Sequence, residues 1–261
     1  MKTVIVPVDF SETSLNAAKY ATQLLTGHYG VTMVLFSFCE TEKEVPEAVQ
    51  NLDKLRTLLR ETGIVKTEIL AVSGPNFINE LDRMAREVGA DLVIMGITGR
   101  SPIGQSLIGS NTLKMVEKKT CPVLIVPVAA VYKETRQVML TSDFENIEYA
   151  SAAAQIKNVL NRLRPHLHIM NTNEEHYVAI TDEYRIKKEQ FSAIFGEFHP
   201  EFHFLALNDV HDAIYQFAND KSIDLIIIVH REQSLVSRLF GKSNTKKLAY
   251  YSTIPVLAVH E

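Results

Sequence analysis

The sequence predicts an α/β protein built from two tandem copies of a five-stranded, parallel, doubly wound domain. Two observations lead to this prediction. Short apolar runs rich in Val, Ile and Leu alternate along the chain with amphipathic stretches of helical period. Such runs are typical of strands buried on both faces of a parallel sheet. The second half of the chain also repeats the first at an offset of 133 residues. Because strand alternates with helix, each copy should be an open sheet with βαβ crossovers.

The first copy spans residues 1–130, and its sequence pattern indicates where each strand and helix lies. Its strands are expected where the apolar runs lie, at residues 3–8, 31–38, 67–72, 91–95 and 122–127. Its helices are expected at the amphipathic stretches 13–26, 43–62, 76–88 and 110–119.

The second copy spans residues 136–261 and follows a connection near 129–135. Its DLIIIV, which begins at Asp224, matches the DLVIMG that begins at Asp91, and the 38 aligned positions from there contain 13 identities without a gap. A repeat of this length is too long for a solenoid and indicates two domains. Its strands are expected near residues 136–141, 166–170, 202–206, 223–229 and 255–259.

Composition excludes several classes of partner. The net charge of −4 gives no reason to expect nucleic acid or an anionic membrane. No apolar run reaches the ~20 residues of a membrane helix, and the apolar VIVPV near the N-terminus does not resemble a signal peptide. Neither Cys39 nor Cys121 has a CxxC partner. We therefore expect a reduced, cytoplasmic protein.

A glycine-rich loop, GITGRSPIGQSLIGSNT at residues 96–112, marks the expected binding site. It holds four of the 11 glycines, and ordering such a loop is entropically costly. The loop runs from the end of the fourth strand to the start of the next helix. Ligands of doubly wound sheets bind at this edge, and a helix N-terminus with free N–H groups suits a phosphate. The alternative is an ordinary loop whose serine caps the helix.

The spacing differs from two better-known phosphate loops. A GxGxxG dinucleotide motif belongs after the first strand, and a P-loop would need a lysine after Gly109. The spacing Gly96-x2-Gly99-x9-Gly109-Ser110 instead resembles the ATP-binding motif of the universal stress protein family. VIVPVDFSETS at the start and CPVLIVPV at the end of the first copy resemble that family's first and last strands.

The resemblance covers the whole chain as a tandem pair of Rossmann-like (adenine nucleotide alpha hydrolase-like) domains. It implies binding of ATP, or of AMP or ADP, either with or without Mg²⁺. An aspartate after the first strand contacts the adenosine part in this family, and a backbone contact to the base falls at the end of the second strand. The implied binding residues are Asp9, Phe38, Gly96, Gly99, Arg100, Gly109, Ser110, Asn111 and Thr112.

Asp9 has a second interpretation. Asp9 and Glu12 have the spacing of a capping box, so Asp9 would cap the following helix. The second copy keeps Asp143 at the matching position, which favours a structural role. The two roles are compatible with one another.

The second copy has lost the glycine motif. Val229, Glu232 and Lys242 stand where the first copy has its three motif glycines. These side chains keep the backbone away from a ligand, and the acid repels phosphate. We therefore expect one nucleotide per chain.

Further motifs predict little chemistry. Phe240-Gly241-Lys242-Ser243 resembles the tail of a P-loop, but Val236 stands where the first glycine belongs. His166 and His168 share one face of a predicted strand, and no third metal ligand lies nearby in the sequence. We therefore expect no metal site.

Three functions are compatible with these observations. The first is a nucleotide-binding regulator in the stress response with little or no catalysis and no catalytic residues. The second is a slow Mg²⁺-dependent ATPase or phosphotransfer protein, and the third is a scaffold whose loop binds nothing. The apolar last strands of the two copies are expected to pair as an intramolecular pseudo-dimer, with a homodimer also allowed.

Overall fold

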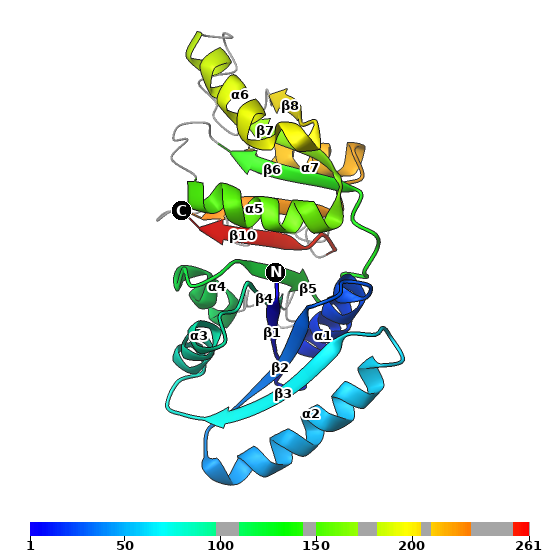
Figure 1. Ribbon diagram of the computed structural model, residues 1–261, viewed down its shortest axis with the longest axis vertical. Helices are drawn as coiled ribbons and strands as arrows, with labels where there is room; N and C mark the ends of the chain where they lie inside the picture. The colour runs from blue at the N-terminus through cyan, green and yellow to red at the C-terminus, as the bar shows by residue number, and fades with distance from the viewer. Residues whose placement is uncertain (98–109, 143–149, 172–181, 205–209, 231–252, 261) are drawn as a thin grey trace. The chain divides into compact units, whose positions relative to one another are not determined.

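The computed structural model describes residues 1–97, 110–142, 150–171, 182–204, 210–230 and 253–260. It divides into two compact units, Met1–Tyr132 and Lys133–Glu261. Both units are layered α/β structures (Figure 1), as the alternation of apolar runs and amphipathic stretches predicts.

The first unit contains one parallel sheet in the order β3-β2-β1-β4-β5. The chain extends the sheet in one direction from β1 to β3 and then returns to place β4 on the other side of β1. This reversal leaves the carboxyl ends of β1 and β4 as the edge at which doubly wound sheets bind ligands. The strands are β1 (Thr3–Pro7), β2 (Thr32–Cys39), β3 (Lys66–Ser73), β4 (Leu92–Ile97) and β5 (Val123–Pro127).

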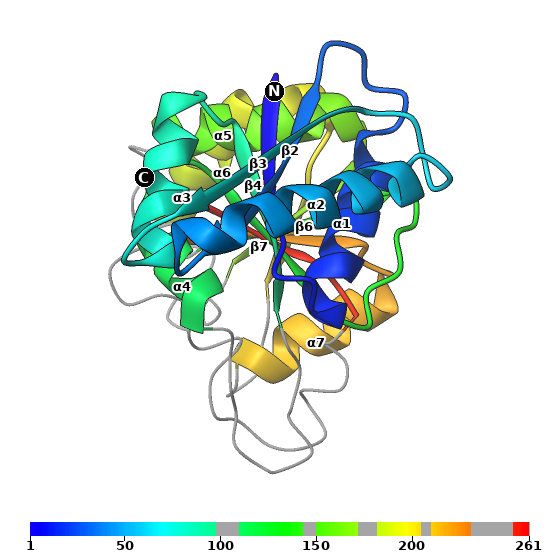
Figure 2. The same cartoon turned by 90° about the horizontal axis from the view of Figure 1, so that it is seen from below.

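Helices cover both faces of this sheet. Figure 2 shows α1 (Glu12–Leu25) on the side of β4 opposite to α3 (Phe77–Glu87) and α4 (Ser110–Glu117). The amphipathic stretch predicted as one helix over 43–62 is a 3₁₀ turn, Glu42–Glu44, followed by α2 (Val45–Leu59), which packs on β2 and β3. A proline in the first turn of α2 explains this start, because proline needs no N–H partner there.

The second unit repeats this strand order as β8-β7-β6-β9-β10, again parallel. The predicted fold class, two tandem doubly wound domains, is therefore confirmed. Its strands are β6 (Gln137–Ser142), β7 (His166–Asn171), β8 (Glu201–Phe204), β9 (Leu225–His230) and β10 (Val256–His260). Its helices are α5 (Ala150–Leu163), α6 (Asp182–Phe195) and α7 (Val210–Asp220).

An aspartate joins two strands at the amino edge of each sheet. Asp91 Oδ2 accepts hydrogen bonds from the backbone N–H groups of Lys2 and Thr3, just before and at the start of β1. Asp224 Oδ2 accepts the equivalent bonds from Arg136 and Gln137, at 2.9 and 3.0 Å. Each carboxylate thus satisfies two backbone donors at once and fixes the starts of two strands that are neighbours in the sheet.

The sheets supply most of the core. Ile5 of β1, Phe36 of β2, Ile94 of β4 and Met139 of β6 are among the largest fully buried side chains. Cys39 and Cys121 are buried thiols that are not joined in a disulfide. Within the described part of the chain, no helix is long and apolar enough to cross a bilayer.

Candidate functional site

A pocket of about 330 Å³ opens at the carboxyl edge of the first unit's sheet. This volume lies within the range of small-molecule sites. The pocket is built from the ends of β1, β2 and β4 and the starts of three helices. It is lined by Pro7, Val8, Asp9, Ser11, Thr13, Ser14, Phe38, Phe77, Met95, Gly96, Asn111 and Thr112.

The turn between β1 and α1 fixes Asp9 at the pocket. Asp9 Oδ1 accepts hydrogen bonds from the backbone N–H of Ser11 at 3.0 Å and from its hydroxyl at 2.6 Å. Partial burial by itself would raise the pKa of the Asp9 carboxyl, but hydrogen bonds from Ser11 and Ser14 hold that pKa below its usual value. The side chain is therefore a carboxylate at neutral pH.

The cap of α1 is Ser11, so the interpretation of Asp9 as the capping residue is wrong. The Ser11 hydroxyl oxygen accepts the N–H of Ser14, and the helix begins at Glu12. Asp9 lies two residues too early to bond the N–H groups of the first turn, and it holds the capping serine instead. Phe10 between them has a φ of 62°, which is uncommon for a bulky residue and marks a tightly constrained turn.

Gly96 allows β4 and α1 to approach backbone to backbone. A Cβ at Gly96 would lie 2.5 Å from both the carbonyl oxygen and Cγ2 of Thr13. The carbonyl oxygen of Gly96 accepts the Thr112 hydroxyl at 3.0 Å, and Thr112 is buried. The hydrogen of that hydroxyl is thus committed to joining α4 to β4, and a ligand would meet the backbone of Thr112 instead of a hydroxyl donor.

Two aromatic rings form one wall of the pocket. Phe38 of β2 and Phe77 of α3 have ring centroids 5.9 Å apart, and both are half-buried. A flat apolar ligand has a stacking surface there. The N-termini of α1 and α4 contribute Ser11 and Asn111 to the lining, and helix N-termini attract anions.

The structure brings together five of the nine residues that the sequence implied, which are Asp9, Phe38, Gly96, Asn111 and Thr112. Ser110 begins α4. Gly99, Arg100 and Gly109 lie outside the described residues.

Sequence reasoning missed other residues of the pocket. Ser11 and Ser14 had a signal, because a cluster of hydroxyl residues follows Asp9. Phe77 and Met95 had none, since an apolar residue at a strand end or helix start looks like any other core residue.

The second unit has a valine at the position of Gly96. Val229 lies in β9, where it pairs with Val259 of β10 as Gly96 pairs with Val126 of β5. Its side chain is half-buried. Asp143, Glu232 and Lys242 lie outside the described residues.

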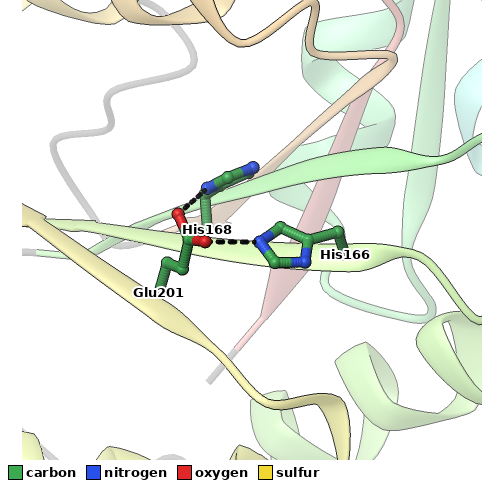
Figure 3. Close-up of side chains that lie close together, drawn as sticks. All are labelled: His166, His168 and Glu201. Carbon is green, nitrogen blue, oxygen red and sulfur yellow. Dashed lines mark ion pairs between the residues drawn. The ribbon is translucent and has the colours of Figure 1, made fainter.

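A histidine cluster forms at the amino edge of the second unit's sheet. His166 and His168 of β7 meet Glu201 of β8 (Figure 3), at 3.0 Å from His166 Nε2 and 3.4 Å from His168 Nδ1. His203 Nε2 lies 3.1 Å from His168 Nδ1. Sequence reasoning found no third donor near the histidine pair, because the third and fourth come from a strand more than 30 residues away along the chain.

Burial lowers the pKa of two histidines in this cluster. His168 is 2% exposed. Burial first, and then the neighbouring His166 and His203, lower its pKa to about 4. Burial likewise lowers the pKa of His203. Both rings are therefore neutral at physiological pH.

Comparison with known proteins agrees with this fold. The sequence model of the universal stress protein family matches residues 1–127 and 167–260. Universal stress protein MJ0531 of Methanocaldococcus jannaschii is 29% identical over 143 residues, which cover 48% of this chain and 81% of that protein. Universal stress protein MJ0577 of the same organism is 27% identical over 154 residues, covering 48% and 94%.

A solved structure resembles the whole chain. The universal stress protein from Archaeoglobus fulgidus DSM 4304 superposes with a TM-score of 0.70 at 17% identity, and the alignment covers 99% of this chain and 98% of that one. The fold is thus shared over both units, and the family match extends over most of the chain. This chain belongs to the universal stress protein family.

Proposed function

We propose that the first unit binds one adenine nucleotide, ATP or its AMP or ADP relatives, and that the protein is a nucleotide-binding regulator in the stress response. The observation that carries this proposal is the pocket at the carboxyl edge of β1 and β4. It gathers Asp9, Phe38, Gly96 and Asn111, which are far apart in the sequence, beside the start of the helix that follows the glycine-rich loop.

The chemistry of the lining suits the three parts of a nucleotide. The Asp9 carboxylate would accept hydrogen bonds from ribose hydroxyls, as acidic residues do in dinucleotide folds. Phe38 and Phe77 would stack against the adenine. Backbone N–H groups at the start of α4, with the Asn111 amide, would donate to the phosphates, where the helix dipole also favours negative charge.

Little or no catalysis is expected at this site. Among the described lining residues, Asp9 is the one acid, and no histidine or lysine accompanies it. Asp9 already accepts two hydrogen bonds from Ser11, which suits a positioned acceptor better than a general base. Mg²⁺ would reach the site with the phosphates and would serve mainly to neutralise them.

One nucleotide per chain is expected. Val229 stands at the register position that Gly96 occupies in the first unit, so the second unit lacks the first glycine of the motif. A micromolar affinity corresponds to ~8 kcal/mol, a reasonable sum for several backbone–phosphate bonds and a buried base.

The test uses the purified full chain. Nucleotide released on denaturation is identified by chromatography, and ATP is then titrated by calorimetry into stripped protein. The proposal expects adenine nucleotide at about one equivalent per chain. Two equivalent sites would overturn the stoichiometry, and no binding would favour a scaffold. A turnover assay with Mg²⁺-ATP distinguishes a regulator from a slow ATPase.

A further inference from the structure

The amino edge of the second unit's sheet gathers four nitrogen and oxygen donors on one face. Because side chains alternate along a strand, His166 and His168 of β7 share a face, as do Glu201 and His203 of β8. The register pairs His168 with Glu201, which places all four side chains on the same face. We propose that these four residues form a binding site for a divalent transition metal ion, with zinc as the metal.

The spacing of three of the four donors matches zinc coordination. Ligands 2.0–2.1 Å from a tetrahedral zinc ion lie about 3.3 Å from one another. His168 Nδ1 lies 3.1 Å from His203 Nε2 and 3.4 Å from Glu201 Oε2, and that oxygen lies 3.5 Å from His203 Nε2. These three atoms form a triangle with nearly the edge lengths of a zinc tetrahedron.

His166 supplies the fourth donor. Its Nε2 lies 3.0 Å from Glu201 Oε1, and the donor atoms of His166, His168 and Glu201 all lie within 4.8 Å of one another (Figure 3). Three imidazoles and one carboxylate are a ligand set that zinc accepts. The His166 and Glu201 side chains are both partly exposed, which gives the ion a path from solvent.

A second layer of contacts orients the innermost ligand. Gln137 Oε1 of β6 lies 2.9 Å from His168 Nε2. Because an amide oxygen can only accept, Nε2 carries the hydrogen and donates this hydrogen bond. Nδ1 then presents its lone pair to the cluster. Histidines that bind metals usually hold their other nitrogen in this way. The ring of Phe217 packs against His168 and His203, with centroids 5.5 and 4.6 Å away.

Lys221 would compete with a metal ion for the Glu201 carboxylate. Lys221 Nζ lies 3.9 Å from Glu201 Oε2, at the outer limit of an ion pair, and its side chain is 45% exposed. Such a contact contributes little energy. A bound metal ion would displace the Lys221 ammonium from Glu201. Replacing Lys221 with Gln should therefore strengthen metal binding.

The test is a Zn²⁺ titration of the full chain, free of any affinity tag and treated with a chelator. Calorimetry should give one zinc ion per chain, and Co²⁺ substituted for it should show the strong visible absorption of a tetrahedral site. Glu201→Gln and His203→Gln should each weaken Zn²⁺ binding by at least about tenfold, because each removes one ligand. His199→Asn is the matched control, since this exposed histidine lies outside the cluster, and it should bind as the wild type does.

Several outcomes would overturn the site. They are no stoichiometric Zn²⁺ binding by the wild-type chain, unchanged binding in Glu201→Gln, or an equal loss of binding in the control. The Glu201 side chain is 47% exposed and Gln has the same shape, so this variant should keep the fold and decides the matter even where His203→Gln does not fold.

Discussion

Gly96 and Thr13 are in direct backbone contact, so that a Cβ on Gly96 would lie 2.5 Å from the Thr13 carbonyl oxygen. The contact sets how close α1 lies to β4 at the rim of the pocket. Glycine is needed here because of a neighbouring helix, in addition to any ligand. The first turn of α1 carries Ser11 and Ser14, so this contact also helps to position the groups around Asp9.

Gly96→Ala should destabilise the protein by about 1–3 kcal/mol, because the added methyl group meets backbone that has little room to move. Its nucleotide affinity should fall as well, since α1 must shift. Urea unfolding and calorimetry measure the two effects. Gly196→Ala is the control, because a Cβ there meets nothing within 4 Å. Equal stability of both variants would contradict the packing argument.

The two roles of the β1–α1 turn should separate by mutation. Asp9→Ala should weaken nucleotide binding by more than about tenfold, because it removes a charged hydrogen-bond acceptor worth roughly 1.5–3 kcal/mol. Ser11→Ala should mainly lower stability, by about 1 kcal/mol, because it removes the helix cap. Calorimetry and urea unfolding of both variants test this. A larger loss of affinity in Ser11→Ala than in Asp9→Ala would assign Asp9 a purely structural role.

The variant Gly109→Lys introduces into the first copy the residue that the second copy has at the matching position, Lys242. We expect at least a tenfold loss of nucleotide affinity, about 1.4 kcal/mol, with the fold retained. The reverse change, Lys242→Gly, should create no second site, because Val229 and Glu232 remain. Nucleotide titration of both variants provides the measurement, and an unchanged affinity in Gly109→Lys would remove the loop from the site.

The buried His168 should make the protein sensitive to mild acid. In the folded chain burial lowers its pKa to about 4, whereas the unfolded chain protonates near 6.5. The unfolded state therefore binds one more proton between these values. The charged or titratable groups around the ring are His166, His203, Glu201 and Lys221. The contribution of neutral His168 to the free energy of unfolding should be fully present above pH 6.5. It should be lost as the pH falls toward 4, by up to about 1.4 kcal/mol per pH unit.

His168→Gln should flatten this dependence while lowering stability at neutral pH. Urea unfolding at a series of pH values gives the slope for each protein. His199→Asn should keep the wild-type slope, because this exposed ring lies outside the cluster. If the slope of His168→Gln between pH 6.5 and 4 equals that of the wild type, the buried ring does not cause the acid sensitivity.

The sequence predicted the fold well for a physical reason. Strands buried on both faces, such as Val4–Ile5–Val6, must be continuously apolar, and amphipathic helices must alternate with them, so local patterns report the architecture. The family resemblance implied Asp9 and Phe38, and the glycine spacing pointed to Gly96. The structure brings the three together because the carboxyl ends of parallel strands meet at one edge.

Features that depend on atomic distances could not be predicted. No pattern in the sequence says that Thr13 approaches Gly96, or that the Thr112 hydroxyl bonds to its carbonyl. The capping spacing pointed to Asp9 because Ser11 and Asp9 are both good caps, and only the exact start of α1 decides between them. The histidine cluster depends on the register of β7 with β8, which short-range patterns do not report.

The carboxylate that joins the first and fourth strands persists in both halves of the chain. Asp91 and Asp224 bind two backbone N–H groups each, although only one half retains the glycine spacing. Duplicated domains that lack the glycine spacing should therefore still be recognisable by this aspartate just before the fourth strand. A sequence search that uses only the glycine motif would miss such domains, and one that also uses this aspartate would find them.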